Sequence, residues 1–396
     1  MMQISPEIQL FIREHSSDDV RVLALQAKKY PDIDMPTVIT QIAGRKVAAE
    51  KIPSWWEIEK IWYPKHLSLE QCSSEITARY KARLLQGDSL TDLTGGFGID
   101  CSFLATGFKS ATYVERQEEL CEIAAHNFPV LNLNHINIKN EDGVTYLQVM
   151  SPVDCLFLDP ARRNEHGGKT VAISDCEPNV AELEELLLQK ANRVMIKLSP
   201  MLDLSLALKE LKQTQEVHIL SVNNECKELL ILLGQTSPAE ISIHCVNLFT
   251  KGTQKEQHFV FTREQEQCSE CTYTDSLETY LYEPNASLLK AGAFRSIAAA
   301  YPVRKLHPNS HLYTSDTFIE NFPGRIFRIV NQCSFNKKEV KENLADLKKA
   351  NVTVRNFPAT VAELRKRIHL AEGGDTYLFA STLNNGQKVL IRCEKV

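Results

Sequence analysis

The chain has 396 residues, of which 43% are hydrophobic and 24% are charged, values typical of a globular protein with two to four domains. No apolar stretch approaches the roughly 20 residues that cross a bilayer, and residues 1–19 lack the basic-then-apolar pattern of a signal peptide. The net charge of −5 excludes a uniformly basic nucleic-acid coat, and eleven scattered cysteines without framework spacing predict a reducing, cytoplasmic location.

Residues 5–85 are expected to be mostly helical, because polar caps precede runs with apolar residues near helical spacing. All three tryptophans fall within eight positions (Trp55, Trp56 and Trp62), a spacing more typical of helix packing than of a binding face. Residues 66–85 are predicted as one helix. Its polar side chains can close over a ligand or simply pack: Gln71, Ser73, Ser74, Thr77 and Lys81.

Residues 91–100 read TDLTGGFGID and form a candidate cofactor-binding loop. An apolar lead-in ends at Asp92, and Gly95, Gly96 and Gly98 then permit backbone torsions and close ligand approach that a Cβ would block. Such a strand–turn–helix segment can bind a nucleotide-like ligand, although an ordinary strand–helix turn has the same local pattern.

Between residues 89 and about 235, short apolar runs alternate with helical stretches, which predicts βαβ units and a mainly parallel sheet. The expected strands are SLTDL, ATYVE, INIKN, CLFLD, RVMIKL and EVHILSV, with NECKELLILLG as a last strand. Beyond a break near 234–240 we expect a smaller α+β unit that begins with the strands ISIHCVNL and QHFVFT. From Gly324 onward the pattern is β-α-β-α-β-β, with a turn at Asn384–Gly386.

The first strands of the 89–235 region each end in a residue that suits a nucleoside ligand. Glu115 follows the second strand, where an acid can accept both ribose hydroxyl hydrogens. Asp142 and Gly143 follow the third strand and are candidates to hold an adenine amino group. Asp159 follows the fourth. Because the carboxyl ends of parallel strands meet at one edge, we expect these acids to converge on one crevice, although each alone can also be a helix cap or a loop residue.

Two other nucleotide-binding classes fit less well. Thr94 stands where a GxGxG dinucleotide loop would have its first glycine, and no GK[ST] follows the glycines as in a P-loop. In the segment DPARR, Asp159 can accept a proton or orient an N–H group. Arg162 and Arg163 can clamp a phosphate, pair with a guanine edge, or form salt bridges to the acidic domain face.

The glycine loop, Glu115, Asp142 and the DPA tripeptide resemble motifs I to IV of class I S-adenosylmethionine-dependent methyltransferases. Over most of its length the chain resembles bacterial THUMP-like class I methyltransferases, in KIPSWW, EQCSSEITARYKA, DLTGGFGID, DPARR, YEPNASLLKAGAF, LYTSD and FPGRIFR. The resemblance implies an α/β fold in four parts: a helical N-terminal region (1–75), a Rossmann-like methyltransferase domain (76–237), a ferredoxin-like α+β domain (238–322) and a THUMP-like α+β domain (323–396).

The resemblance also implies S-adenosylmethionine as the cofactor and assigns roles. The implied cofactor-binding residues are Asp92, Thr94, Gly95, Gly96, Gly98, Glu115, Asp142 and Gly143, and the implied catalytic residues are Asp159, Pro160 and Arg162. Methyltransferases that modify exocyclic amines carry (D/N)PP(Y/F/W), whereas here Arg162 replaces the stacking aromatic residue, which disfavours methylation of a flipped base amine. Ser199 stands where attack on uridine C5 would need a cysteine, which disfavours that chemistry too.

Charge is unevenly distributed along the chain. Residues 323–396 hold 14 basic and 7 acidic residues, a net charge of +7, whereas residues 1–322 carry −12. This asymmetry predicts a polyanion contact at the C-terminal end, or else a solvated helix face.

The leading hypothesis is a methyltransferase that acts on structured RNA, at an rRNA or tRNA base. The alternatives are a catalytically inactive methyltransferase fold that binds RNA, and an enzyme with a protein or small-molecule substrate. Cys268 and Cys271 form a CxxC pair without a second pair or a histidine at zinc spacing, so we interpret them as incidental thiols and expect no metal there.

Overall fold

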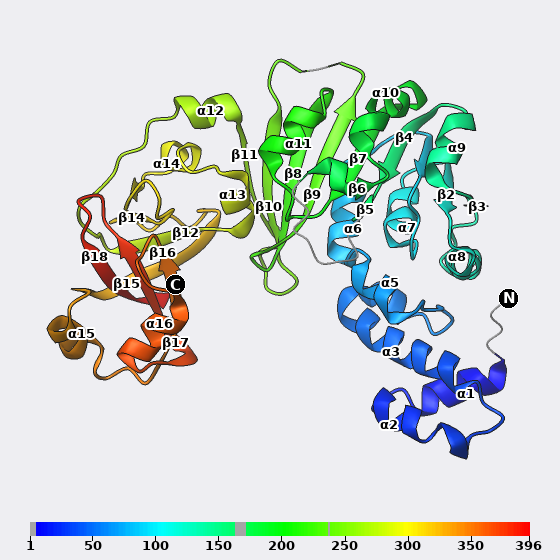
Figure 1. Ribbon diagram of the computed structural model, residues 1–396, viewed down its shortest axis with the longest axis horizontal. Helices are drawn as coiled ribbons and strands as arrows, with labels where there is room; N and C mark the ends of the chain where they lie inside the picture. Colours follow the sequence, from blue (N-terminus) through cyan, green and yellow to red (C-terminus); the bar gives the residue numbers. More distant parts are fainter. Residues whose placement is uncertain (1–4, 163–171, 237) are drawn as a thin grey trace. The chain divides into compact units, whose positions relative to one another are not determined.

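The computed structural model describes residues 5–162, 172–236 and 238–396. The chain divides into two compact units, and Figure 1 colours it along the sequence. Unit 1 comprises Met1–Gln215 and Leu229–Pro238, and unit 2 comprises Glu216–Glu228 and Ala239–Val396.

The N-terminal region is helical, as predicted. Its helices are α1 (Pro6–Glu14), α2 (Val20–Leu25), η1 (Ala27–Lys29), α3 (Met35–Lys51), α4 (Pro53–Trp56), α5 (His66–Gln71) and α6 (Glu75–Ala82). The prediction of one helix over 66–85 was wrong, because the chain breaks between α5 and α6. Ser74 is extended there, and the hydroxyl of Ser73 turns inward to donate to Asp100, a contact that a continuous helix would not place.

The tryptophans connect the N-terminal helices to the residues that follow. Trp55 is buried and packs edge-on against Phe97, with ring centroids 5.1 Å apart. Trp62 stacks on His126 at 3.7 Å. The predicted packing role therefore holds for these two, whereas Trp56 is 42% exposed.

A nine-stranded sheet has the strand order β11-β10-β8-β9-β7-β4-β1-β2-β3. Its strands are β1 (Ser89–Asp92), β2 (Ser110–Glu115), β3 (Ile136–Asn140), β4 (Val153–Leu158), β7 (Ala191–Leu198), β8 (Thr214–Val222), β9 (Glu225–Gly234), β10 (Ser242–Leu248) and β11 (Glu256–Thr262). The strands predicted between 89 and 235 all form. Strands β3, β2, β1, β4 and β7 are parallel to their neighbours in this series, whereas β9 runs antiparallel to β7.

The helices between these strands are α7 (Ile99–Ala105), α8 (Glu118–Val130), α9 (Gly143–Val149), α10 (Val180–Lys190) and α11 (Leu204–Glu210). The strand order runs outward from β1 to β3 and then returns to β4 and β7. Right-handed crossovers therefore place α7 and α8 on one face and α9 and α10 on the other. One core cluster joins α7 and α8 to the N-terminal helices through Phe97, Ile99, Leu120 and Ile123. The α/β, Rossmann-like fold class is confirmed.

The nine-stranded sheet extends past residue 237, although β10 and β11 belong to unit 2, whose second segment begins at Ala239, close to the predicted boundary. The sequence analysis ended the methyltransferase domain at residue 237 and assigned the next two strands to a smaller domain. In the structure these strands, β10 and β11, belong to the nine-stranded sheet, and β10 pairs parallel with β8 over seven residues. The polar segment after β9 resembles a linker in composition, yet it joins two strands of one sheet.

The rest of unit 2 is α+β. Its helices are α12 (Arg263–Cys268), α13 (Ala286–Ala291), α14 (Ser296–Ala300), α15 (Lys337–Leu344) and α16 (Val361–Ile368). A seven-stranded sheet is formed by β13 (Arg304–Lys305), β14 (Tyr313–Ser315), β12 (Tyr280–Pro284), β15 (Gly324–Ser334), β18 (Lys388–Lys395), β17 (Ala371–Thr382) and β16 (Lys349–Arg355), in that order.

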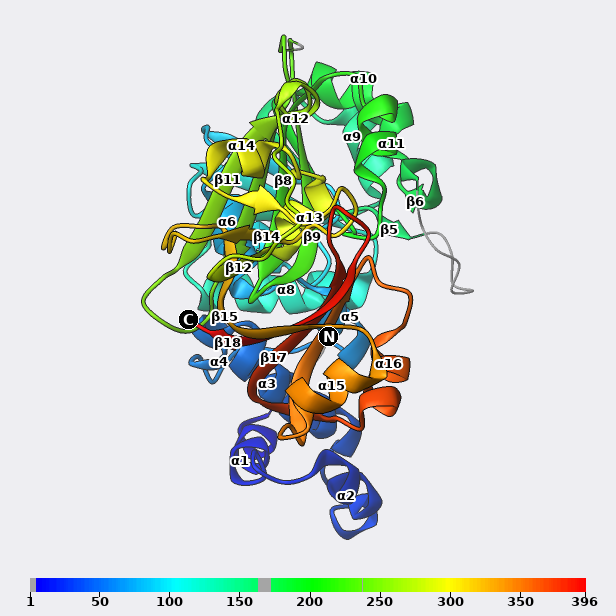
Figure 2. The same ribbon diagram turned by 90° about the vertical axis from the view of Figure 1, so that its left-hand side faces the viewer.

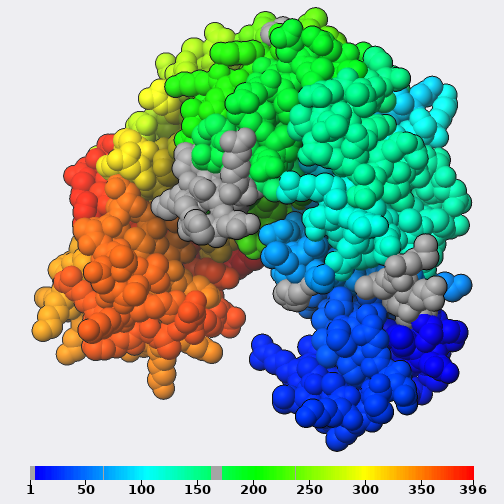
Figure 3. Space-filling model, turned by 45° about the vertical axis from the view of Figure 1, so that its right-hand side comes forward, coloured from blue at the N-terminus to red at the C-terminus, as the bar shows by residue number. Residues whose placement is uncertain are grey.

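Helices α15 and α16 share one apolar cluster, in which Val340, Leu344, Leu364 and Ile368 pack with strand residues such as Leu378. They therefore cover the same face of the seven-stranded sheet (Figure 2). Many of their residues are exposed, and this part of the chain is orange in Figure 3. Within the described ranges, the structure contains no helix with the length and apolarity that crossing a membrane requires.

Candidate active site

The glycine loop after β1 uses its glycines in different ways. Gly96 and Gly98 have φ angles of +54° and +86°, which favour glycine. A Cβ on Gly95 would lie 2.2 Å from the ring of Tyr113, so Gly95 is required for packing. A Cβ on Gly96 would meet nothing nearer than the Thr94 carbonyl oxygen at 3.8 Å. Gly96 therefore presents open backbone, on which a ligand can lie.

Glu115, at the end of β2, is held against this loop. The Gly96 N–H donates to its Oε2 at 2.8 Å, and the Gln117 N–H donates to its Oε1 at 2.8 Å. The Tyr113 hydroxyl donates to the Gly96 carbonyl at 2.5 Å. The structure thus brings Glu115 and Gly96 together, as the sequence analysis expected of two strand ends.

Asp92, at the end of β1, is almost completely buried. Its Oδ1 accepts the Thr94 N–H at 2.9 Å, and no described group forms a hydrogen bond with its Oδ2. Burial, assisted by the negative charges of Asp100, Asp159 and Glu115, raises the pKa of Asp92 to about 8. The carboxyl is therefore mostly protonated at neutral pH and has a buried oxygen that can donate or accept one more hydrogen bond.

Thr94 connects the loop to the next strand end. Its hydroxyl oxygen accepts the Asp159 N–H at 2.6 Å, and it lies 3.5 Å from Asp92 Oδ1. Its backbone N–H binds the same oxygen of Asp92. A glycine at this position, as in a dinucleotide loop, would lack that hydroxyl. Thr94, which replaces the first glycine of a dinucleotide-binding loop, therefore has a structural role in this protein.

A buried ion cluster lies beside the loop. It consists of Lys81 from α6, Asp100 from α7, Lys197 from β7, Asp159 after β4, and Ser73. Lys81 Nζ lies 2.8 Å from Asp100 Oδ1, and Lys197 Nζ lies 3.3 Å from Asp100 Oδ2 and 2.5 Å from Asp159 Oδ2. Ser73 Oγ contacts both ammonium groups, at 2.7 and 3.0 Å, and donates to Asp100 at 2.7 Å.

The charges of this ion cluster balance one another. Lys81 is fully buried and the Lys197 side chain is 9% exposed, and buried ammonium groups need compensation of this kind. Although burial opposes ionisation, the two lysines and Ser73 hold the pKa of Asp100 well below its usual range. Asp159, whose side chain is 38% exposed, is the member that reaches the surface. Burial raises its pKa, and the Lys197 ammonium opposes that shift.

Asp142 and Gly143 lie at the end of β3. Asp142 Oδ1 caps α9, accepting the N–H groups of Val144 at 3.1 Å and Thr145 at 3.0 Å. A Cβ on Gly143 would lie 2.1 Å from the Leu93 carbonyl oxygen, so this glycine lets α9 approach the glycine loop. Asp142 is therefore a helix cap, one of the two roles considered from the sequence, at a position adjacent to the loop.

The DPARR segment continues β4. Pro160 is buried, and Ala161–Arg162 form β5, which pairs with β6 (Cys176–Glu177). The side chain of Arg162 and the whole of Arg163 lie outside the described residues. Of the helix 66–85 candidates, Ser73 and Lys81 join the ion cluster. Thr77 is buried and bonds within its own turn, and Gln71 is exposed.

Sequence reasoning missed two members of the ion cluster, Asp100 and Lys197. Lys197 is the only charged residue in the otherwise apolar run VMIKL, and such a residue in a central strand needs a buried partner. Asp100 is part of the quoted TGGFGID motif, but nothing in the motif distinguishes it from a surface residue of the first helical turn.

The CxxC pair lies in unit 2. Cys268 ends α12 and is exposed, whereas Cys271 is half-buried, and both thiols are free. Within the part of the chain that the structure describes, neither belongs to a group of three close metal-ligating side chains.

Comparison with known proteins assigns the chain to a family. A structure described as a "putative methyltransferase from Porphyromonas gingivalis W83" is 35% identical, covers 98% of both chains and superposes with a TM-score of 0.87. The chain belongs to the THUMP-like class I methyltransferase family. Family models match residues 280–323 as a ferredoxin-like domain and residues 324–395 as THUMP domain-like.

Two more distant structures match a smaller share of the chain. One is described as an rRNA methylase from Streptococcus thermophilus, with 16% identity over 40% of this chain and 93% of that chain and a TM-score of 0.29. The other is described as a putative methyltransferase from Streptococcus mutans in complex with SAH, with 14% identity, coverage of 40% and 96%, and a TM-score of 0.30. Both add nothing to the assignment. No curated protein matches the chain.

Proposed function

We propose that this family member is an S-adenosylmethionine-dependent methyltransferase. The observation that carries the proposal is the loop at Gly96, whose open backbone lies against the Glu115 carboxylate. The buried, unpartnered Oδ2 of Asp92 beside it is a second feature that suits a bound polar ligand. These residues fit S-adenosylmethionine, the cofactor that the resemblance implies.

Each residue has a role in this proposal. Glu115 binds the ribose hydroxyls, Gly96 permits close approach, Asp92 supplies a hydrogen bond toward the polar end of the cofactor, and Asp142 lies on the adenine side. S-adenosylmethionine supplies an electrophilic methyl group. Asp159 orients the nucleophile or accepts its proton, because it is the member of the ion cluster that reaches the surface.

We further propose that the substrate is structured RNA and that the protein acts in the cytoplasm, where its eleven free cysteines stay reduced. The outer sides of α15 and α16 and the segment between them carry exposed basic residues: Lys337, Lys338, Lys341, Lys348, Lys349, Lys366 and Arg367. Other basic residues of this domain are paired, such as Arg325 and Arg355 with Glu283. Seven exposed basic side chains therefore gather on one helical layer, against three exposed acidic ones (Glu342, Asp346 and Glu363), and this excess of positive charge suits a phosphate-binding surface.

Calorimetry with S-adenosylmethionine tests the cofactor assignment. We expect the wild type to bind and Gly96→Arg to lose binding, because the new side chain fills the open space over the loop. Gly252→Arg is the matched control: Gly252 also has a positive φ and open space, but lies in the β10–β11 connection of unit 2. Absence of binding by the wild type, or equal binding by Gly96→Arg, would contradict the proposal.

Methylation of total RNA from a strain that lacks the gene tests the reaction. Nucleoside mass spectra should show one methylated nucleoside that depends on the wild-type protein and is absent with Asp159→Ala. Retained cofactor binding without methyl transfer by the wild type would instead favour the inactive, RNA-binding alternative.

The basic surface has its own test. Substituting Lys337, Lys338 and Lys341 with glutamine should weaken RNA binding and lower the slope of log affinity against log salt by about 0.7–0.9 per lost phosphate contact. The same triple substitution at the exposed lysines of unit 1, Lys28, Lys29 and Lys60, should leave the slope unchanged. Equal effects of the two triple variants would place the RNA contact elsewhere.

A further inference from the structure

A row of imidazoles crosses three neighbouring strands in unit 2. Glu216 and His218 come from β8, His244 from β10 and His258 from β11. His218 lies directly opposite His244 in the parallel pairing, and His258 lies opposite Val246, two residues from His244. Because alternate residues of a strand share a face, these side chains all project from the same face of the sheet.

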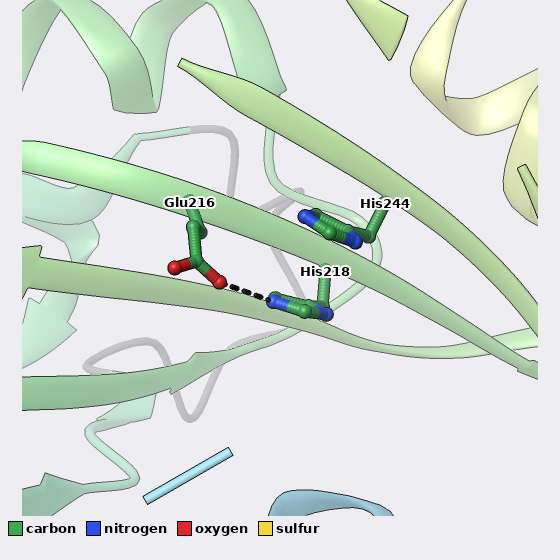
Figure 4. Close-up of side chains that lie close together, drawn as sticks. All are labelled: Glu216, His218 and His244. Carbon is green, nitrogen blue, oxygen red and sulfur yellow. Dashed lines mark hydrogen bonds and ion pairs between the residues drawn. The ribbon is translucent and has the colours of Figure 1, made fainter. Parts of the chain in front are cut away.

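The side chains of this histidine row are in direct contact. Glu216 Oε2 lies 3.2 Å from His218 Nε2, and the His218 and His244 rings stack with centroids 4.3 Å apart (Figure 4). His244 Nδ1 lies 3.1 Å from His258 Nε2. One ligand atom each of Glu216, His218 and His244 lie within 4.8 Å of one another.

We infer that Glu216, His218 and His244 form a binding site for a divalent transition-metal ion of the zinc type. Two imidazole nitrogens and one carboxylate oxygen are a donor set that such ions favour, whereas Mg²⁺ and Ca²⁺ select oxygen ligands. This inference does not depend on the methyltransferase proposal, since it uses residues remote in sequence from the glycine loop.

Binding of such an ion requires the His244 ring to turn out of its stack on His218, because the lone pairs of an imidazole lie in the plane of its ring. Metal–ligand distances near 2.0–2.2 Å place tetrahedral ligand atoms about 3.4 Å apart. The Glu216–His218 pair already has this separation, and the remaining gap can close by rotation of the Glu216 and His244 side chains, which are both partly exposed. His218 is 2% exposed and fixes the inner position.

His258 completes the arrangement as an orienting residue. Its Nε2 contacts Nδ1 of His244, which leaves His244 Nε2 as the ligand atom, and ligating histidines commonly bind such a partner through their other nitrogen.

A bound ion would link β8 to β10, and its binding is directly measurable. The probe is Co²⁺, whose absorption distinguishes nitrogen and oxygen ligands from thiolates, followed by Zn²⁺ in calorimetric competition. The full chain carries Cys268→Ser and Cys271→Ser, so that the CxxC pair does not compete. We expect one equivalent of Co²⁺ to bind without a thiolate charge-transfer band.

Single substitutions locate the site. Glu216→Gln and His244→Gln should each weaken binding by at least about 10-fold, and His258→Gln by about 10-fold, as for other residues that orient a ligand. His15→Gln, at a histidine of α1's C-cap in unit 1, should leave binding unchanged. The test uses His244→Gln and Glu216→Gln because both side chains are partly exposed, whereas His218→Gln would remove a buried side chain and can impair folding.

Two results would overturn the inference. The first is that the protein with intact Glu216, His218 and His244 binds Co²⁺ and Zn²⁺ no more tightly than the His244→Gln variant does. The other is binding that is unaffected by both Glu216→Gln and His244→Gln. Because neither measurement uses S-adenosylmethionine or RNA, failure here would leave the proposed enzymatic function standing.

Discussion

The glycine loop and the ion cluster both bury carboxyl groups in unit 1, but they stabilise them differently. In the ion cluster, Asp100 contacts two lysine ammonium groups and a serine hydroxyl. In the glycine loop, Asp92 and Glu115 accept hydrogen bonds from backbone N–H groups, and one oxygen of Asp92 has no hydrogen-bond partner among the described groups. The carboxylate of the cluster is therefore balanced by positive charge, whereas the loop keeps a buried carboxyl oxygen without a hydrogen-bond partner among the described groups.

The largest expected effect concerns the ion cluster. Lys81→Met leaves Asp100 buried with one of its two ammonium partners, and we expect the free energy of unfolding to fall by about 3–5 kcal/mol. All three tryptophans lie in unit 1, so urea unfolding followed by their fluorescence reports on this unit. Lys65→Met removes an exposed pair with Glu119 and should cost less than about 1 kcal/mol. Equal costs would show that the cluster contributes no more than a surface pair.

The second prediction concerns the contact within the ion cluster that holds its exposed member, the 2.5 Å contact of Lys197 with Asp159. If the protein is a methyltransferase, Lys197→Met should lower kcat by about 100-fold, because Asp159 loses the group that positions it. Affinity for S-adenosylmethionine should stay within about 3-fold, since Lys197 is a positioning residue that acts through Asp159.

Lys190→Met is the control for this variant. Lys190 ends α10, directly before β7, and binds the Met150 carbonyl at 2.6 Å instead of a carboxylate. It should leave kcat unchanged. A Lys197→Met protein that keeps full kcat, or loses cofactor binding to the same extent as kcat, would contradict the positioning role.

The third prediction separates the two buried aspartates by pH. The folded-state pKa of Asp92 is raised to about 8, so its contribution to stability is present below its unfolded pKa near 4 and is lost as the pH rises toward 8. The folded-state pKa of Asp100 is lowered, so its contribution is present above the unfolded pKa and is lost only on acidification. Between pH 5 and 8, Asp92 alone of this pair should give a slope.

Urea unfolding at four pH values in that window measures the slope. The wild type should lose up to about 1.4 kcal/mol per pH unit relative to Asp92→Asn, which has no titrating group at this position. Asp100→Asn is expected to be less stable throughout but to keep the wild-type slope. A wild type and Asp92→Asn with parallel stability curves would show that Asp92 is ionised in the folded state.

The part of the site predictable from the sequence is the part within local motifs. Gly95, Gly96 and Glu115 were identified because a strand end followed by glycines, and an acid at the next strand end, have fixed positions in a parallel sheet. The strands themselves were predictable because apolar runs alternate with helical ones. Residues that act through local backbone geometry are therefore visible in a single sequence.

The ion cluster was not predictable in the same way, because its members come from elements far apart in the chain. Ser73 and Lys197 are separated by 124 positions, and their contact depends on how α6, α7 and β7 pack. The continuation of the nine-stranded sheet into β10 and β11 was missed for a similar reason. Composition suggests a linker after β9, whereas the hydrogen bonds of β10 to β8 are a long-range feature.

The smallest expected effect concerns Thr94, where the loop meets Asp159. Thr94→Val keeps the shape of the side chain but removes the acceptor of the Asp159 N–H, and we expect a loss of about 1 kcal/mol in unfolding free energy, since Asp159 is only partly buried. Thr94→Ser retains the hydroxyl and should recover most of that loss. Urea unfolding of the two variants, read by tryptophan fluorescence, measures the difference.

Thr94→Val also tests whether the glycine loop and Asp159 of the ion cluster are coupled through the Thr94 hydroxyl. If the hydroxyl holds the Asp159 backbone at the loop, Thr94→Val should lower cofactor affinity and kcat together, whereas Lys197→Met lowers kcat alone. Thr94→Gly, which restores the dinucleotide-loop pattern, should behave as Thr94→Val does, because it also lacks the acceptor. If Thr94→Gly instead had the cofactor affinity and kcat of the wild type, the Thr94 hydroxyl would not be needed for either.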